Sequence, residues 1–344
     1  MVTTSATPFQ VSFLLVPDFS MIAFTCAMEP LRMANLISDR SLYQWSTVSL
    51  GGEPVQASNG LRIVPDMALE SLSGPSLLVV CGGLHIQRHC SRGLIQGIRK
   101  LTSRRLALGA ICTGSYVLAR AELLNGYRST IHWENMASMR EDFPHLVISN
   151  ELFEIDRDRY TCSGGTAPLD MMLHLIGAQQ SQGLASAISE TFICERIRTR
   201  HDRQRIPLRL RLGTSQPKLV EAVSLMEANL EEPMSPDELA KHVGLSRRQL
   251  ERLFQKYLNC VPTRYYLELR LARARQLLLQ TTMSIVDVAF ACGFVSAPHF
   301  SKCYRDFFGI PPRDERRRRQ STATATTAAA IPAADDAAAS YGSD

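Results

Sequence analysis

The sequence predicts a chain of two domains, an α/β domain followed by an all-helical domain that contains two helix-turn-helix units. Three observations lead to this prediction. The 344 residues exceed what one ordinary hydrophobic core holds. Strand-like and helix-like segments alternate up to about residue 190. Beyond residue 215 the strand signal disappears, and one helical pattern occurs twice.

Short β-branched or apolar runs, bounded by Gly, Pro or Asp, indicate the strands of the first domain. These runs are residues 11–16, 45–50, 76–81, 107–111 and 146–148. Apolar residues at helical spacing occupy residues 22–37, 94–103, 113–121 and 167–180. The alternation favours a parallel sheet with helices on both faces, in which ligands bind at the carboxyl ends of the strands.

An irregular, Arg-rich segment separates the two patterns and is interrupted by Pro207 and Gly213. We therefore predict a first domain at 9–194, a linker at 195–215 and a helical domain at 216–316. The Ser/Thr/Ala-rich segment at 317–344 is typical of a disordered tail.

Charge is distributed unevenly. Residues 1–194 contain 14 Lys and Arg against 16 Asp and Glu, whereas residues 195–334 contain 24 against 14. A basic helical domain favours a polyanionic partner such as DNA, although basic residues can also simply solvate helices.

Nine cysteines without a C-x-x-C pair indicate reduced thiols rather than disulfides or a metal site, and the sequence suggests no cofactor. With neither a signal peptide nor a long apolar segment, we expect a cytoplasmic protein without membrane contact.

The repeat in the helical domain is the most specific signal. Its first copy spans 235–254 and its second 284–304. Ala240 and Gly244 recur 49 residues later as Ala289 and Gly293, and the turn that follows is one residue longer in the second copy.

Each repeated residue type has a mechanical reason. A serine caps the first helix of each copy, an alanine allows close helix packing, and a glycine permits the left-handed backbone of a sharp turn. The second helix of each copy has an apolar face and a polar face, and the polar face suits a DNA major groove.

Residues 218–315 resemble the DNA-binding domain of the AraC/XylS family of regulators. The second copy carries that family's I-x-x-V-A-x-x-x-G-F and F-S-K-x-Y-R-D-F-F-G motifs, followed by Pro-Pro. The resemblance implies that a long helix, including 270–279, joins two units that read successive major grooves. Glu315 departs from the family pattern, in which an aromatic residue often stands at this position.

The resemblance also implies which side chains contact DNA. In the first unit these are Arg247, Arg248, Glu251 and Arg252; in the second they are Ser296, Ala297, Pro298, His299 and Lys302. Arginine can pair bidentately with guanine, whereas Ala297 and Pro298 offer only apolar contact. We therefore expect the first unit to discriminate more strongly between sequences.

Three short motifs of the first domain stand at predicted strand ends. AICTGS at 110–115 places Cys112 and Thr113 where a strand turns into a helix, as in a nucleophile elbow. VVCGG at 79–83 ends a strand with Gly82 and Gly83, whose amides could approach a ligand. IHWE at 131–134 supplies His132 and Trp133.

These motifs resemble the DJ-1/PfpI branch of the class I glutamine amidotransferase-like superfamily, over roughly 9–190, which implies a flavodoxin-like α/β fold. Members of that branch use the elbow cysteine and a histidine matching His132. Their acidic residue after the first strand is replaced here by Ala23, so thiolate formation at Cys112 lacks one partner.

The combination resembles regulators that sense amino acids or quaternary amines with a degenerate amidotransferase-like pocket. Glu29 and Arg32 could bind the charges of a zwitterion, and Trp133, Phe19 and Phe24 a methylammonium group. The plainer alternatives are an inert small residue at Cys112 and a structural hydrogen bond for His132. For the others they are a surface i, i+3 pair for Glu29 and Arg32, and core positions for both phenylalanines.

We therefore predict a transcriptional regulator, an activator by resemblance, that binds double-stranded DNA and a small-molecule effector. RNA polymerase is an expected partner, and a homodimer is the expected assembly. A hydrolase, glutaminase or hydratase tethered to DNA is the second hypothesis, which steady turnover abolished by Cys112→Ala would favour. A purely architectural DNA binder is the third, which effector-independent binding would favour.

Overall fold

The computed structural model describes residues 7–101, 106–205 and 208–317. The chain divides into two units, Met1–Thr214 and Ser215–Asp344, which are described separately. The first unit contains β1 (Phe9–Leu15), α1 (Met21–Ser38), β2 (Tyr43–Ser49), η1 (Leu50–Gly52), β3 (Val55–Gln56), β4 (Arg62–Ile63), β5 (Met67–Ala68), η2 (Leu69–Ser71), β6 (Leu77–Cys81), α2 (Ile86–His89), α3 (Arg92–Leu101), β7 (Ala107–Ile111), α4 (Gly114–Arg120), β8 (Arg128–Ser129), α5 (Met136–Asp142), β9 (Val147–Ile148), β10 (Phe153–Asp156), β11 (Arg159–Cys162), α6 (Ala167–Gln179), α7 (Gln182–Thr191) and α8 (Leu208–Arg211).

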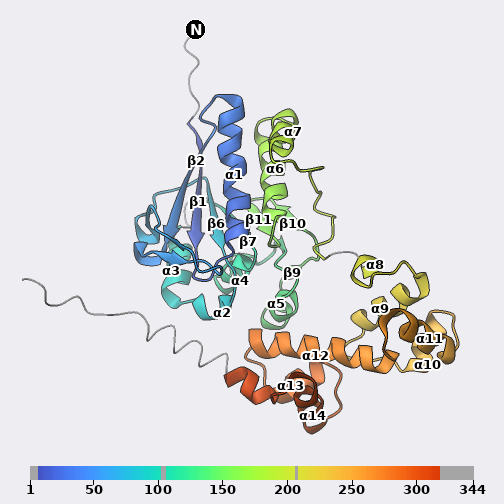
Figure 1. Cartoon of the computed structure of the whole chain (residues 1–344). Coiled ribbons are helices and arrows are strands. Elements are labelled where there is room, and N and C mark those ends of the chain that lie inside the picture. The colour runs from blue at the N-terminus through green and yellow to red at the C-terminus, as the bar shows by residue number, and fades with distance from the viewer. Residues whose placement is uncertain (1–6, 102–105, 206–207, 318–344) are drawn as a thin grey trace, which may run out of the picture. The chain divides into compact units, whose positions relative to one another are not determined.

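The main sheet of the first unit has the order β10-β11-β7-β6-β1-β2-β5 (Figure 1). All its neighbouring strands are parallel except the β10–β11 pair. Successive strands are added on opposite sides of β1: β2 pairs with one edge of β1, and β6 pairs with the other edge. Such a switch point is where open α/β sheets bind ligands, so the carboxyl ends of β1, β6 and β7 define the region of interest.

Helices cover both faces of this sheet. On β1, Val11, Phe13 and Leu15 pack with α1, α6 and α7 in one apolar cluster, while Leu14 packs with α3, α4 and α5 in another. This alternation of buried side chains follows from the two-residue repeat of a strand. The doubly covered, mainly parallel sheet that the sequence predicts is confirmed.

Most predicted elements of the first unit lie within two residues of the observed ones, but the strand at 146–148 needs correction. It forms β9, which pairs only with β8 in a separate two-stranded sheet. The β10–β11 hairpin is not predicted from the sequence, because its charged residues make it look like a surface loop. Glu154 is nevertheless buried against Arg128, with 3.1 Å between the charged groups. The last two residues of the helix predicted at 94–103 lie outside the described part of the chain.

Residues 195–205, here called the strap, lie along the first unit. The Arg198 guanidinium pairs with the buried carboxylate of Asp170 at 2.7 Å, and Arg196 pairs with Asp202. The amide of Leu152 donates to the carbonyl of Arg200 at 2.9 Å. The predicted linker at 195–215 therefore needs correction, since its first half is anchored to the first domain and the boundary falls between residues 214 and 215.

The described residues of the second unit, 215–317, form helices. Those whose bounds lie within the described residues are α9 (Pro217–Ala228), α10 (Pro236–His242), α11 (Arg247–Leu258), α12 (Pro262–Gln280), α13 (Ile285–Ala291) and α14 (Ala297–Phe308). Both α11 and α13 contact α12, whose 19 residues make it about 28 Å long and so separate the two helical pairs. The tail predicted at 317–344 lies outside the described residues, apart from Arg317.

No helix in the described segments is long and apolar enough to cross a bilayer. The same segments contain no group of three or more His, Cys, Asp or Glu side chains placed to hold a metal ion.

Candidate ligand site and nucleic-acid interface

Cys112 occupies the sharp turn between β7 and α4. Its φ of 57° is in the left-handed region, which is rare for a residue with a β-carbon and typical of strained functional turns. The Cys112 amide donates to the carbonyl of Ser163 at 3.2 Å, and its carbonyl accepts from the amide of His132 at 3.2 Å. Cys112 is therefore held between the ends of three segments, as the predicted elbow requires.

Gly82 and Gly83 lie beside this elbow, but they pack against backbone. A β-carbon on Gly82 would lie 2.4 Å from the Gly114 nitrogen, and one on Gly83 would lie 1.9 Å from the Asp18 carbonyl oxygen. The Gly82 amide donates to Ile111, and the Thr113 hydroxyl donates to the Gly83 carbonyl at 2.7 Å. The amide of Gly82 is thus already used, which corrects the prediction that it approaches a ligand.

The His132 ring and the Cys112 thiol both border Gly164. A β-carbon there would meet the His132 Cδ2 at 2.8 Å and the Cys112 Sγ at 3.1 Å. The His132 Nδ1 lies 3.9 Å from a carboxylate oxygen of Glu134. Gly164 is not among the predicted site residues, because strand β11, which ends two residues earlier, is not predicted from the sequence. The available signal was the Gly-Gly pair at 164–165.

Burial decides the ionisation of this pair. Burial raises the pKa of the Cys112 thiol to about 12. The hydrogen bond from the backbone N–H of Thr113 lowers this pKa, but burial has the larger effect. Burial also lowers the pKa of His132, opposed by the Glu134 carboxylate. At neutral pH both groups are therefore uncharged, which suits a binding wall better than a thiolate–imidazolium nucleophile.

Trp133 stands next to His132, with 5.8 Å between the ring centroids. The guanidinium carbon of Arg205, from the strap, lies 4.6 Å from the Trp133 ring centroid. The neighbouring Gln204 Nε2 donates to the Thr130 hydroxyl at 2.9 Å. The strap is thus attached to the segment that carries two of the predicted effector-binding residues.

The other predicted effector residues lie elsewhere. Glu29 and Arg32 form an exposed i, i+3 pair on α1, with 2.7 Å between the charged atoms. Glu29 lies nine residues after the N-cap Ser20, so it is roughly 13 Å along the helix from the end that approaches the site. Phe19 and Phe24 are buried and pack edge-to-face at 5.8 Å, so the core interpretation is right for both.

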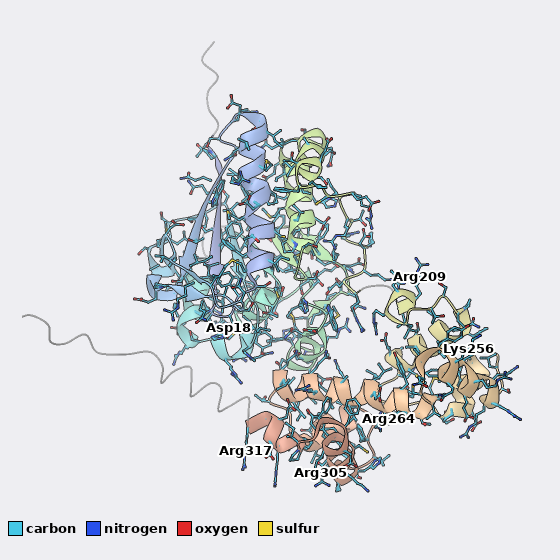
Figure 2. All side chains as sticks on the ribbon, viewed as in Figure 1. Asp18, Arg209, Lys256, Arg264, Arg305 and Arg317 are labelled. Atoms are coloured by element: carbon cyan, nitrogen blue, oxygen red, sulfur yellow. The ribbon has the colours of Figure 1, made fainter. Side chains whose placement is uncertain are left out.

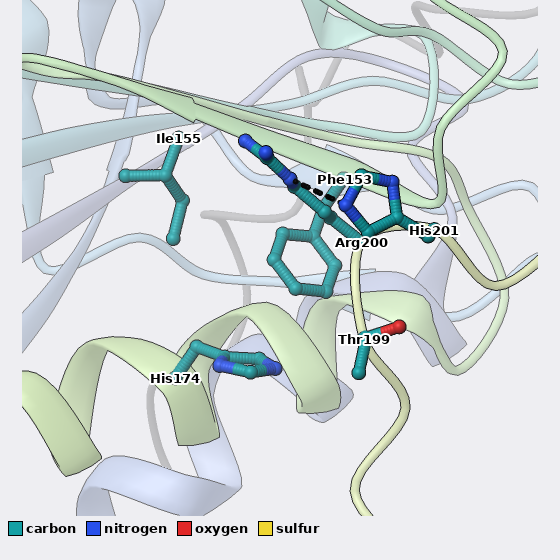
Figure 3. A pocket seen from close by; sticks show the side chains of 6 residues that line it. All are labelled: Phe153, Ile155, His174, Thr199, Arg200 and His201. Carbon is teal, nitrogen blue, oxygen red and sulfur yellow. Dashed lines mark hydrogen bonds between the residues drawn. The ribbon is translucent and has the colours of Figure 1, made fainter.

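A separate groove of about 330 Å³ lies where the strap crosses β10 and α6 (Figure 3). Its lining side chains are Phe153, Ile155, His174, Thr199, Arg200 and His201. The His174 Nε2 lies 3.1 Å from the carbonyl oxygen of Arg198, which holds the strap at this point. None of the sequence-predicted effector residues lines the groove.

The two helical pairs of the second unit are built alike. Ser235 and Ser284 each form a reciprocal capping box, with Glu238 and Asp287 respectively, at the start of the first helix. Gly244 and Gly293 have φ values of 69° and 71° in the turns. The predicted capping and turn chemistry is therefore confirmed at both copies.

On α11 the residues predicted to contact DNA fall into two groups. Arg248 and Arg252 are exposed one helical turn apart, on the face opposite the buried Leu250 and Phe254. Arg247 pairs instead with Asp237 at 3.3 Å and with Glu251 at 3.0 Å. Arg248 and Arg252 can therefore reach a base without first breaking an ion pair that is found in the described part of the chain.

On α14 the predicted set is exposed or half-buried. Ser296 caps the helix by accepting from the amide of His299 at 3.4 Å, so its hydroxyl has a structural role. Pro298, His299 and Lys302 are exposed, and Ala297 is half-buried. The His299 Nε2 lies 3.4 Å from the Cys303 Sγ on the next turn. Further basic side chains of the unit include Lys256, Arg264 and Arg305 (Figure 2).

Arg270 is a positioning residue that the sequence analysis did not single out. Its guanidinium donates to the carbonyls of Cys292 and Gly293 at 2.8 and 2.7 Å and lies 4.1 Å from the Phe294 ring centroid. These contacts tie the second turn to α12, and so fix the direction in which α14 leaves that turn. Only the spatial contact identifies this role, because an arginine on a long helix has no distinctive sequence signal.

Comparison with known proteins adds independent findings. Residues 10–178 match the model of the DJ-1/PfpI family, and residues 239–318 match a helix-turn-helix domain model. The HTH-type transcriptional regulator GbdR of Pseudomonas aeruginosa (strain PAO1) is 58% identical, with 90% of this chain and 84% of that protein covered. The regulator CdhR of the same organism is 46% identical over 88% and 90% of the two chains. A ThiJ/PfpI family protein of Pseudomonas syringae shares the fold at 20% identity and a TM-score of 0.50, covering 70% of this chain and 90% of its own.

Proposed function

This chain belongs to the AraC-type helix-turn-helix transcriptional regulators that carry a DJ-1/PfpI domain, and on that premise we propose that a small-molecule effector bound beside Cys112 controls it. The chain is a DNA-binding regulator. The observation that carries the effector proposal is the state of the elbow. Cys112 has the strained backbone of a nucleophile, yet burial raises the pKa of its thiol to about 12.

The expected ligand is a small amino acid or a quaternary amine. Cys112, Thr113, His132 and Trp133 provide a mixture of polar and aromatic groups at the carboxyl ends of the strands. The predicted role of Glu29 and Arg32 in effector binding applies only to a ligand that extends along α1. Since an uncharged thiol is a poor nucleophile, we infer that the protein binds its effector without turning it over.

We further propose that the protein is an activator that contacts RNA polymerase, and that it acts as a homodimer in the cytoplasm, where its DNA lies. Support comes from the family and from the exposed reading faces of α11 and α14. A DNA template transcribed with and without effector by purified polymerase tests activation. Sedimentation of the full chain tests the dimer.

The DNA-reading residues are tested with duplexes selected by the full chain from a random pool. Arg252→Ala and Arg248→Ala should each weaken binding to the selected duplex more than binding to unrelated DNA, because each removes a bidentate contact to a base. Lys218→Ala is the matched control, since it removes one charge from α9, outside both helical pairs. Equal losses in all three variants at fixed salt would contradict the assignment of the reading face.

The effector is tested by thermal shift with amino acids and methylated amines. A ligand present at 100 times its dissociation constant stabilises the folded state by about 2.7 kcal/mol. His132→Ala should abolish the shift produced by any ligand found. A shift that survives this substitution would place the effector elsewhere, for example in the groove under the strap.

A further inference from the structure

The strap bridges its groove between two anchored points. On one side the Asp170 carboxylate accepts from the Arg198 amide at 2.7 Å and pairs with the guanidinium of the same residue. On the other side Arg203 forms an antiparallel bridge with Glu151. Residues 199–201 lie between these anchors and supply one wall of the groove. The groove is therefore built into the folded first unit.

The floor of the groove is apolar and aromatic. Phe153 of β10 is only 3% exposed, and its ring lies 5.1 Å from the His174 ring of α6, measured between centroids. Ile155, two residues further along β10, adds a branched apolar side chain. Figure 3 shows Phe153 between His174 and the strap residue Arg200. A volume of about 330 Å³ is at the lower end of the range for small-molecule sites, so it suits one compact apolar body.

The acidic side chains beside the strap already have basic partners. Asp202 pairs with Arg196 and also accepts from the Thr199 amide at 2.7 Å. The Glu151 carboxylate lies 3.2 Å from the His201 Nδ1. The side chains described as lining the groove include no carboxylate, whereas they include one guanidinium and two imidazoles. The groove therefore favours a negatively charged occupant.

Arg200 is the lining residue best placed to receive an anion. It is exposed, and its Nε donates to the His201 Nε2 at 3.2 Å, which leaves its two terminal nitrogens for a bidentate contact. In the described part of the chain, no carboxylate forms an ion pair with Arg200. A guanidinium beside an apolar floor is the chemistry that recognises a carboxylate attached to an apolar body.

We propose that the groove under the strap is a second small-molecule site, which takes a carboxylate attached to a compact, uncharged aromatic or branched apolar body. The carboxylate pairs with Arg200, and the apolar body lies on Phe153 and Ile155. This site shares no lining residue with the elbow at Cys112, so it goes beyond the effector function proposed above. Its ligand contacts residues 199–201 between the two anchors and so stabilises the strap, the segment that leads on to the second unit.

Two contributions set the size of the expected effects. A hydrogen-bonded contact between a carboxylate and an exposed guanidinium changes affinity by about tenfold. Burial of a phenyl or isopropyl group on the groove floor contributes at least about tenfold more. A ligand that lacks either the charge or the apolar body should therefore bind at least about tenfold more weakly than one that has both.

The experiment is calorimetric titration of the full-length chain with phenylacetate and with 3-methylbutanoate. Phenylacetamide, which is neutral, and acetate, which has no apolar body, are the comparison ligands. The variants are Arg200→Gln, Arg200→Lys, Ile155→Trp and, as the matched control, Arg203→Gln, which removes a strap arginine that does not line the groove. Unfolding midpoints in urea establish that each variant is folded under the titration conditions.

We expect at least one of the two apolar carboxylates to bind, with phenylacetamide and acetate weaker by about tenfold or more. Arg200→Gln should weaken carboxylate binding about tenfold, and Arg200→Lys less, because lysine keeps the charge but not the bidentate geometry. Ile155→Trp should abolish binding by filling the groove, whereas Arg203→Gln should leave it unchanged. The carboxylate that binds more tightly shows whether the site prefers an aromatic or a branched body.

The proposal is overturned if neither carboxylate binds, if phenylacetamide matches phenylacetate, or if Arg200→Gln weakens binding no more than Arg203→Gln does. Because Arg200 is exposed, its variants decide the question even where Ile155→Trp does not fold. Loss of carboxylate binding in His132→Ala, with Arg200→Gln unaffected, would also overturn it, because the ligand would then lie at the elbow. None of these results bears on the effector function, which is tested with amino acids and methylated amines.

Discussion

Alkylation of Cys112 separates a sensor from an enzyme more directly than any activity screen. Burial raises the pKa of this thiol to about 12, and the side chain lies among the buried residues of the first core. At pH 7 the thiolate fraction is then about 10⁻⁵, compared with about 10⁻² for an ordinary cysteine. Since only the thiolate reacts, Cys112 should be alkylated about a thousandfold more slowly than an ordinary exposed cysteine.

The assay is a time course with iodoacetamide on the folded full-length protein, followed by mass spectrometry of the peptides. Cys303 is half-buried and serves as the internal reference, which we expect to be modified while Cys112 remains free. The rate at Cys112 should rise about tenfold per pH unit between pH 7 and pH 10, because the thiolate fraction does. The unfolded protein, in which all nine cysteines should react, provides the control.

Two results would refute this reasoning. One is modification of Cys112 at the rate of Cys303 at pH 7; the other is a Cys112 rate that no longer changes above pH 7. Either would mean that Cys112 is a thiolate at neutral pH. The hypothesis of a tethered hydrolase would then regain weight, with turnover lost in Cys112→Ala as its test.

The remaining predictions concern both units. Arg252→Ala should cost about 1 to 3 kcal/mol of sequence-specific binding, measured by anisotropy on a selected duplex, and unchanged affinity would contradict it. Glu315→Ala should lower the free energy of unfolding by about 1 to 3 kcal/mol in urea, because the buried Tyr304 hydroxyl loses its acceptor at 3.2 Å; a wild-type midpoint would show that this bond contributes nothing. Gly164→Ala should cost about 1 to 3 kcal/mol by forcing the His132 ring aside, and a neutral outcome in the same assay would mean that the ring moves freely. Since burial lowers the pKa of His132, stability should fall as the pH drops through the ordinary histidine pKa of about 6.5, and His132→Gln should flatten that part of the profile.

The sequence by itself predicts those structural features that depend on residues close together in the chain. Capping serines, turn glycines and the apolar faces of α11 and α14 act within a few residues, so the two helical pairs followed from their spacing alone. The same holds for the elbow at Cys112, where a buried strand meets a helix. The hairpin β10–β11 could not be predicted in this way, because its charged residues are paired with distant partners, such as Arg128 for Glu154.

Contacts between distant positions decided the rest. Glu315 looked like a departure from the family pattern, yet its carboxylate accepts from Arg275 at 3.1 Å and from Tyr304, which closes that domain. Phe19 and Phe24 lie in the hydrophobic core. The Arg-rich strap belongs to the first unit, where the Arg205 guanidinium lies over the Trp133 ring. Local order follows from short-range sterics and hydrogen bonding, whereas burial and the pairing of charges depend on which remote segments the fold brings together, and no periodicity in the sequence records that.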